Sequence, residues 1–309
     1  MLDEAEYLDV IPFIDAHAHL WDLHGAIRYP WLTPPFNDGP GGSIKLIAND
    51  YLLDDYQADA RRWNVKGLVH VDAAADPAQA TDETRWLEGI AATHGMPNAI
   101  VAFAPLNDPD VESALKAQAT YSHVRGVRQI LNWHADASRR FTARDLTQDE
   151  QWRRGFGLLG RYNLSFDLQC YPGQMLALAP LFERHPEIPV IIDHLGMPIA
   201  SDPDGFVQWR QGLKALAALP HVAIKLSGVG FIYPDWTTDR LRPLLLEVIN
   251  LFGIHRCMFA SDFPTDKLFA SFDRHLDAYH QIVADFSEEE RHCLFNRNAN
   301  RVYRLGIQL

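Results

Sequence analysis

The stretch Phe13-Ile14-Asp15-Ala16-His17-Ala18-His19-Leu20 is the first of a series of apolar, strand-like runs, and it ends in two histidines. Side chains of a strand alternate between its two faces, so His17 and His19 share one face. Two neutral imidazoles on a rigid strand form half of a transition-metal site, which needs a further nitrogen or carboxylate ligand. Two ordinary surface or core histidines would give the same pattern, so the missing ligands must be sought elsewhere in the chain.

Similar runs recur along the chain, with segments of helical length between them. The expected strands are Phe13–His17, Val65–Ala73, Ala99–Leu106, Val124–Leu131, Ser165–Tyr171, Pro189–Leu195, Val222–Ser227 and Cys257–Asp262. The expected helices are Tyr51–Trp63, Pro77–Thr93, Asp110–Ala119, Gln148–Tyr162, Pro172–Arg184, Gly205–Ala218, Thr238–Leu251 and Ser271–Ala284.

Strands that alternate with helices form a parallel sheet, which is either open or closed into an eight-stranded barrel. Eight repeats in 309 residues favour the barrel, and no strand is followed by the Gly-x-Gly-x-x-Gly turn of an open dinucleotide-binding sheet. We therefore predict a distorted (β/α)8 TIM barrel that forms a single domain over residues 1–309.

Two segments lie outside this repeat. Trp21–Asp50 is rich in proline, glycine and aromatic residues, and we expect it to be an irregular loop beside the active site. Near the C-terminus, Ser287 is a good helix cap. We expect Asn296–Leu305 to form a closing helix that packs on the outside of the barrel and takes no part in catalysis.

Charge and composition exclude several kinds of partner. A net charge of −12 disfavours general binding to nucleic acid or to anionic membranes. The N-terminal residues are acidic where a secretory signal would be basic, and no apolar run is long enough to span a bilayer. Three widely spaced cysteines fit a reducing compartment, so we expect a soluble cytoplasmic protein, with a homo-oligomer left open.

Polar side chains gather at the ends of the expected strands, where the catalytic residues of a TIM barrel lie. They are His17, His19, His70, Asp72, Arg128, Gln169, Tyr171, Asp193, His194, Lys225, Ser227, Ser261 and Asp262. Each has a structural alternative: His194 and His70 could be packed core histidines, Asp262 could cap a turn, and Lys225 could reach outward between helices. Their joint occurrence on several strand ends favours a site.

Four motifs carry a resemblance to a known family. They are His17-Ala18-His19, Asp193-His194-Leu195-Gly196-Met197-Pro198, Ile224-Lys225-Leu226-Ser227-Gly228 and Ala260-Ser261-Asp262-Phe263-Pro264. Together they resemble the amidohydrolase superfamily, in particular the lactonase branch of amidohydrolase family 2, whose members act on pyrone dicarboxylate, sulfomuconolactone, fuconolactone and rhamnonolactone. Ala18, Met197 and Phe263 depart from residues that are frequent in that branch, which puts the substrate pocket in doubt.

The resemblance implies hydrolysis of a lactone at one divalent metal ion. The fourth strand has no lysine to bridge two metals, so we expect a single ion, Zn²⁺ or alternatively Mn²⁺, held by His17, His19 and Asp262, with His194 as a fourth ligand or as a hydrogen-bond donor. Some members work without metal. Asp262 would act as general base on a water, while the ion, or His19 and His194, polarises the ring carbonyl.

The substrate itself is expected to be a small sugar lactone or carboxylated lactone, with the sugar type favoured. The candidate substrate-binding residues are Arg128, Lys225, Tyr171, Gln169, Trp31 and His70. Arg128 would bind a carboxylate through two parallel N–H donors, and Lys225 would supply a single positive charge. Two alternatives stay open: a lactone isomerase or aromatic-acid decarboxylase on the same barrel, and a barrel that binds without catalysis.

Overall fold

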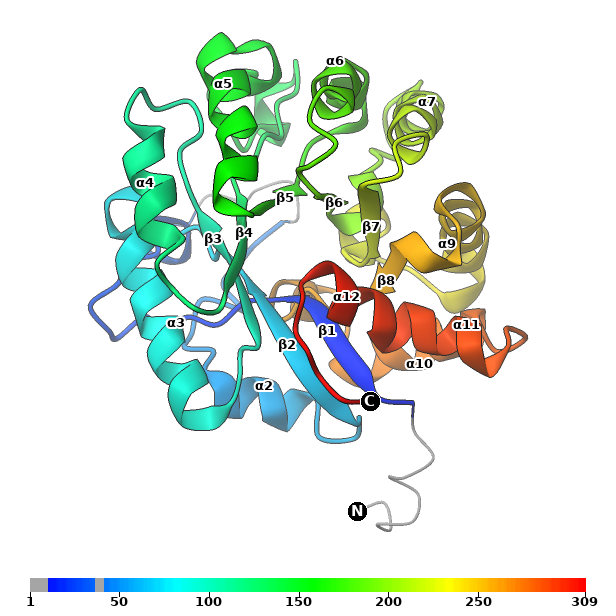
Figure 1. Ribbon diagram of the computed structural model, residues 1–309. Coiled ribbons are helices and arrows are strands. Elements are labelled where there is room, and N and C mark those ends of the chain that lie inside the picture. Colours follow the sequence, from blue (N-terminus) through cyan, green and yellow to red (C-terminus); the bar gives the residue numbers. More distant parts are fainter. Residues whose placement is uncertain (1–10, 37–41) are drawn as a thin grey trace.

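The computed structural model describes residues 11–36 and 42–309 of the chain. Within them, eight parallel strands follow one another in chain order, each hydrogen-bonded to the next. They are β1 (Phe13–Ala18), β2 (Val65–Val71), β3 (Ala99–Phe103), β4 (Val124–Arg128), β5 (Ser165–Leu168), β6 (Val190–Ile192), β7 (Val222–Leu226) and β8 (Cys257–Phe259). Figure 1 shows helices surrounding these strands, so the predicted (β/α)8 barrel is confirmed.

The α-helices of the described residues run between successive strands and beyond β8. They are α2 (Leu53–Asp59), α3 (Ala80–His94), α4 (Val111–Gln118), α5 (Glu150–Leu158), α6 (Pro172–Glu183), α7 (Gly205–Ala217), α8 (Val229–Ile232), α9 (Thr238–Phe252), α10 (Phe272–Ile282), α11 (Glu288–His292) and α12 (Asn298–Val302). The expected cap is present, because the Ser287 hydroxyl accepts from the Glu290 N–H at the start of α11. The helix expected over Tyr51–Trp63 is shorter and ends at Asp59.

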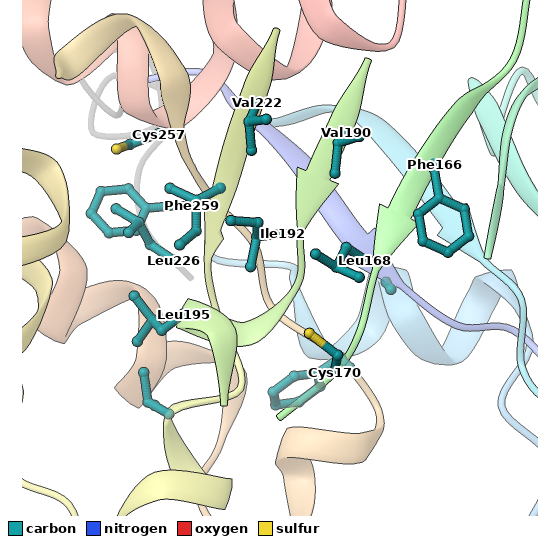
Figure 2. Packing of buried hydrophobic residues seen from close by; sticks show 14 of the residues in the cluster. Phe166, Leu168, Cys170, Val190, Ile192, Leu195, Val222, Leu226, Cys257 and Phe259 are labelled. Atoms are coloured by element: carbon teal, nitrogen blue, oxygen red, sulfur yellow. The ribbon is translucent and has the colours of Figure 1, made fainter. Parts of the chain in front are cut away.

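Side chains of the strands separate into two layers because successive residues point to opposite faces. Figure 2 shows Phe166, Leu168, Val190 and Ile192 among the outward-pointing residues of one apolar layer. Inward-pointing residues such as Ile191 form a second buried cluster that fills the barrel.

The barrel is closed by the segment that follows β8. The Asp262 N–H donates to the His17 carbonyl at 2.8 Å, and the His19 N–H donates to the Phe263 carbonyl at 2.8 Å. This closure lies at the C-terminal ends of β1 and β8. It therefore brings the two histidines of β1 beside the aspartate that follows β8.

Several strands end earlier than the sequence pattern predicts. β6 ends at Ile192 rather than Leu195, and β8 ends at Phe259 rather than Asp262. The residues that follow leave the sheet to turn into loops, and several adopt left-handed backbone, among them His194 with φ of 53° and Asp262 with φ of 57°. Residues other than glycine take this conformation uncommonly, and strained residues of this kind cluster at functional sites.

The expected place of the C-terminal segment is wrong. Ala299 and Tyr303 belong to the apolar cluster inside the barrel, together with Ile14 and Val69. Figure 1 shows α12 crossing the end of the barrel where the chain enters β1. Helix α12 and Tyr303, which we call the C-terminal plug, therefore fill the N-terminal mouth. The inward side chains of Ala99 and Ala223 in the same cluster are small and leave room for the tyrosine.

The segment Trp21–Asp50 is irregular where it is described, apart from one short 3₁₀ helix at Pro30–Leu32. Residues 37–41 of this loop and the acidic N-terminal residues lie outside the described part of the chain. Among the described helices, none combines the length and the apolar character that a membrane crossing requires.

Candidate active site

His17, His19 and Asp262 lie together at the C-terminal mouth of the barrel. The Nε2 atoms of His17 and His19 lie 3.5 Å and 3.3 Å from Oδ1 of Asp262. All three side chains are buried. The period-two alternation of β1 places the histidines side by side, and the closure onto β8 adds the carboxylate.

The hydrogen bond on the far side of the His19 ring favours the tautomer that leaves its Nε2 unprotonated. Nδ1 of His19 lies 2.7 Å from the Val71 carbonyl, to which it must donate. Nδ1 of His17 lies 3.2 Å from Oδ1 of Asp193 and 3.1 Å from Nζ of Lys225, and these two contacts hold the ring in place. A carboxylate or carbonyl behind a histidine fixes a metal ligand in this way. Among the described residues, Nε2 of His17 has no hydrogen-bond partner.

Burial keeps both histidines neutral. Desolvation lowers the pKa of His19 to about 3, and desolvation together with the Lys225 ammonium lowers the pKa of His17 well below its usual value. Desolvation raises the pKa of Asp262 to about 6, so its carboxylate is mostly ionised at pH 7. Two neutral imidazoles and a carboxylate thus face one another.

This donor set fits a divalent cation. Ligand atoms of His17, His19 and Asp262 all lie within 4.8 Å of one another, as do those of His17, Asp193 and His194. Imidazole nitrogens and a carboxylate suit zinc. The fourth ligand predicted from the sequence, His194, falls in the second group and not with His19 and Asp262.

His194 lies beside the carboxylate of Asp262. Its Nδ1 is 3.1 Å from Oγ of Ser227 and 3.8 Å from Oδ2 of Asp262. Burial lowers the pKa of His194, so the ring is neutral at pH 7. Gly228 has φ of 65°, and a Cβ there would lie 2.5 Å from Cβ of His194, so only glycine fits behind this ring.

Lys225 does not lie where a substrate-binding residue would. It is fully buried beneath His17, and its Nζ lies 2.5 Å from Oδ2 of Asp167 and 3.0 Å from Oδ1 of Asp193. Burial alone would raise the pKa of Asp193, but the Lys225 ammonium and His17 lower it well below its usual range. The lysine therefore neutralises the carboxylate that orients His17.

This charged cluster continues to the opposite mouth of the barrel. The Tyr303 hydroxyl donates to Oδ2 of Asp167 at 2.8 Å, and both residues are fully buried. Desolvation raises the pKa of Asp167 to about 6. A continuous chain of polar contacts thus runs from the C-terminal plug through Asp167, Lys225 and Asp193 to His17.

Arg128 is held rigidly at the end of β4. It donates to Oε1 of Gln169 at 2.7 Å and to the backbone carbonyl of Asp72. Its side chain is 4% exposed, and among the described residues its Nε has no hydrogen-bond partner. A buried guanidinium N–H without a partner is costly, so Arg128 is poised to donate to a bound molecule.

A cavity of about 420 Å³ opens above these groups. His19, Arg128, Gln169, His194 and Asp262 line it, as does Trp31 from the loop after β1. The structure thus brings together six of the residues predicted from the sequence.

Four further predicted residues do not line the cavity. His17 contacts Asp262 but is not part of the lining. Lys225 is buried below it, as described above. His70 is fully buried and accepts a hydrogen bond from the Leu20 N–H, which makes it a support for the chain after β1. Tyr171 lines a separate, smaller cleft of about 230 Å³, and its hydroxyl donates to the Arg139 carbonyl.

Sequence reasoning missed three members of the site. Asp193 adjoins His194 in a quoted motif but received no role. Asp167 is a lone carboxylate between Phe166 and Leu168 of β5, and this interruption of an apolar strand was a usable signal. Tyr303 gave no signal, because its contact with Asp167 joins positions 136 residues apart.

The chain is similar to known proteins over nearly its whole length. A sequence model described as amidohydrolase matches residues 14–305. The uncharacterized protein y4mH of Sinorhizobium fredii is 40% identical over 296 residues, which cover 96% of this chain and 99% of that protein. An L-fucono-1,5-lactonase of Burkholderia multivorans is 28% identical over 304 residues, which cover 94% of this chain and 96% of that one. A crystal structure of an amidohydrolase from Burkholderia multivorans with bound zinc has a TM-score of 0.78 at 27% identity, covering 94% of this chain and 99% of that one.

Proposed function

This chain belongs to the amidohydrolase family, and we propose that it hydrolyses the ester bond of a small lactone by means of a water activated by Asp262. One observation carries the proposal. Among the described residues, Nε2 of His17 and Oδ2 of Asp262 have no hydrogen-bond partner, and they lie together with His19 at a cavity that Asp262, His19 and His194 line. The similarity to an L-fucono-1,5-lactonase supports a lactone as substrate.

Asp262 has the properties of a general base. Its pKa of about 6 leaves the carboxylate mostly ionised at pH 7, yet basic enough to take a proton from an attacking water. As the water oxygen bonds to the carbonyl carbon, the ring C–O bond breaks and the proton held by Asp262 passes to the leaving oxygen. The product hydroxy acid then ionises and releases one proton.

His194 stabilises the oxyanion in this scheme. It is neutral and lines the cavity, so it can donate one N–H to the carbonyl oxygen as negative charge develops there. Such a donor contributes about 3 to 4 kcal/mol to transition-state stability in other enzymes. Gly228 and Ser227 fix the position of the ring.

We further propose that His17, His19 and Asp262 hold one zinc ion, with manganese as the alternative. When bound, the ion would polarise the ester carbonyl and promote ionisation of water. The zinc in the similar Burkholderia multivorans structure supports this choice. Asp193 and Val71 then serve to orient the two histidines.

Arg128 and Gln169 are proposed to bind the substrate beyond the reacting ester. Within the described residues Nε of Arg128 has no hydrogen-bond partner, and Gln169, which accepts from the same guanidinium, also lines the cavity. Trp31 is already fixed, because its indole N–H donates to the Ala73 carbonyl at 2.8 Å. It therefore supplies a flat apolar contact.

The test is a pH-indicator assay of the zinc-loaded protein against sugar, carboxylated and alkyl lactones. Hydrolysis releases one proton per turnover, whereas isomerisation releases none, so the stoichiometry separates the two reactions. Asp262→Asn should lower kcat/KM by about 10²- to 10⁴-fold, as expected for loss of a general base. Asp202→Asn is the matched control, because Asp202 pairs with His134 outside the cavity. Retained turnover in Asp262→Asn would refute its role.

We also propose that the protein works in a reducing compartment such as the cytoplasm. Cys170, Cys257 and Cys293 are all buried and free. Unpaired cysteines support such a compartment, because disulfides form mainly in oxidising ones.

A further inference from the structure

The cavity above Asp262 has two chemically different sides. The polar residues lie at its floor, where the strands end. The wall is apolar and comes from the loops that follow the strands; it includes Trp31, Ile44, Phe141, Met197, Phe231 and Leu268. Phe231 lies next to the reacting groups, because its ring centroid is 6.2 Å from that of His194.

Two polar side chains of the wall, those of Trp31 and Arg140, already donate to backbone carbonyls. The indole N–H of Trp31 donates to Ala73, as described above. Arg140 donates from Nε to the His134 carbonyl at 2.7 Å and from a terminal nitrogen to the Ala135 carbonyl at 2.8 Å. Several ring hydroxyls placed against this wall would lose their hydrogen bonds to water, at about 1 to 3 kcal/mol each.

One large side chain of the wall is exposed in the absence of a ligand. Phe141 is 42% exposed at the mouth of the cavity. The cavity volume of about 420 Å³ falls in the range of about 300 to 1,000 Å³ that is typical of drug-sized ligands. A bare lactone ring would leave much of this space, and Phe141, in contact with water.

Resting on the hydrolase function proposed above, we propose that the preferred substrate is a lactone with an apolar substituent, an alkyl chain or an aromatic ring, seated against Phe141, Met197 and Phe231. The ester group lies at Asp262 and the substituent lies along the wall. This departs from the sugar lactone favoured by the sequence, because Gln169 and the aromatic loop gave no information on what the other loops contribute.

The experiment measures kcat/KM of the zinc-loaded enzyme for 1,5-lactones that carry hydrogen, propyl or pentyl at the ring carbon next to the ring oxygen. Dihydrocoumarin and L-fucono-1,5-lactone complete the panel. Each methylene buried on the wall should raise kcat/KM by about 4-fold. The alkyl and aryl lactones should therefore exceed the sugar lactone.

Two failures are distinguishable. If no lactone in the panel is hydrolysed, the proposed function is wrong. If L-fucono-1,5-lactone is hydrolysed with a kcat/KM equal to or above that of the pentyl lactone, hydrolysis stands and the apolar substituent is refuted.

A variant pair locates the substituent. Phe141→Ser should reduce the gain per methylene, with a larger loss for the pentyl lactone than for the unsubstituted ring. Leu176→Ser is the matched control, because Leu176 is 50% exposed on α6 and does not line the cavity. It should leave the whole series unchanged. An unaltered gain per methylene in both Phe141→Ser and a second variant, Leu268→Asn, would overturn the placement.

Discussion

The two mouths of the barrel are built from the same strands but differ in the partners of their buried polar groups. At the N-terminal mouth, the Tyr303 hydroxyl and the Lys225 ammonium both donate to Oδ2 of Asp167, so this carboxylate has a buried cation beside it, although its Oδ1 has no partner within the described residues. At the C-terminal mouth, Nε2 of His17 and Oδ2 of Asp262 have no hydrogen-bond partner within the described residues. A buried carboxylate paired with a cation is neutralised inside the fold, whereas buried acceptors without a donor or a cation are retained at a cost where a ligand completes them. The difference assigns stability to one mouth and chemistry to the other.

Lys225→Met should produce the largest loss of stability. It leaves the Asp167 and Asp193 carboxylates buried without their cation, and breaking a buried ion pair costs about 3 to 5 kcal/mol. Urea denaturation of the metal-free protein measures the change. Lys267→Met is the control, because Lys267 is 44% exposed where it pairs with Asp59, and should cost less than about 1 kcal/mol. Equal losses in the two variants would contradict the structural role of Lys225.

Tyr303→Phe tests whether the plug is purely structural. Loss of the hydroxyl removes one donor from Asp167, and a hydrogen bond to a charged group contributes about 1.5 to 3 kcal/mol to the free energy of unfolding. The kcat/KM should change by less than about twofold, because Tyr303 does not touch the cavity residues. Tyr162→Phe, whose hydroxyl meets Glu112 on the surface, is the control for both measurements. A large fall in kcat/KM would show that the two mouths are coupled.

Asp193→Asn should weaken zinc binding by about 10- to 100-fold, because it removes the carboxylate that orients His17. Competition with a chromophoric chelator measures the affinity. Asp202→Asn serves again as the control, since its carboxylate lies outside the cavity. Unchanged affinity in Asp193→Asn would mean that His17 is oriented without this hydrogen bond.

Glu83 is a buried residue of α3. Glu83→Gln should alter the pH dependence of stability, with a smaller effect than the substitutions above. Desolvation, reinforced by Asp72, raises the pKa of Glu83 from 4.5 to about 8, so between these values the folded protein holds a proton that the unfolded chain has lost. Stability therefore falls as pH rises through this range. The glutamine variant should lose less stability than the native protein between pH 5 and 8, by about 1.4 kcal/mol or more. Parallel curves for the two proteins would contradict the raised pKa.

Local sequence pattern was enough to predict the barrel and the residues of the site that lie at the ends of β1, β6 and β8. Period-two alternation placed His17 and His19 on one face of β1, and the motifs after β6 and β8 located His194 and Asp262. These inferences need only neighbouring residues and the rule that parallel strands present their C-terminal ends at one mouth.

The remainder depends on contacts between distant segments. Lys225 lies on the expected strand, but only the fold shows that Asp167 and Asp193 surround it below the cavity. The entry of Tyr303 into the barrel depends on small inward side chains such as Ala99 and Ala223. The apolar wall is assembled from several loops, none of which has a periodic pattern.

Calorimetric titration of zinc into the metal-free protein tests most directly whether unpaired acceptors at the C-terminal mouth form a cation site. His17→Ala should abolish the tight site. His24→Ala should leave it intact, because His24 belongs to a separate exposed cluster with Asp22 and Asp50. One tight zinc ion in the native protein and in His24→Ala, and none in His17→Ala, is the predicted result. Undiminished tight binding in His17→Ala would contradict the proposed site.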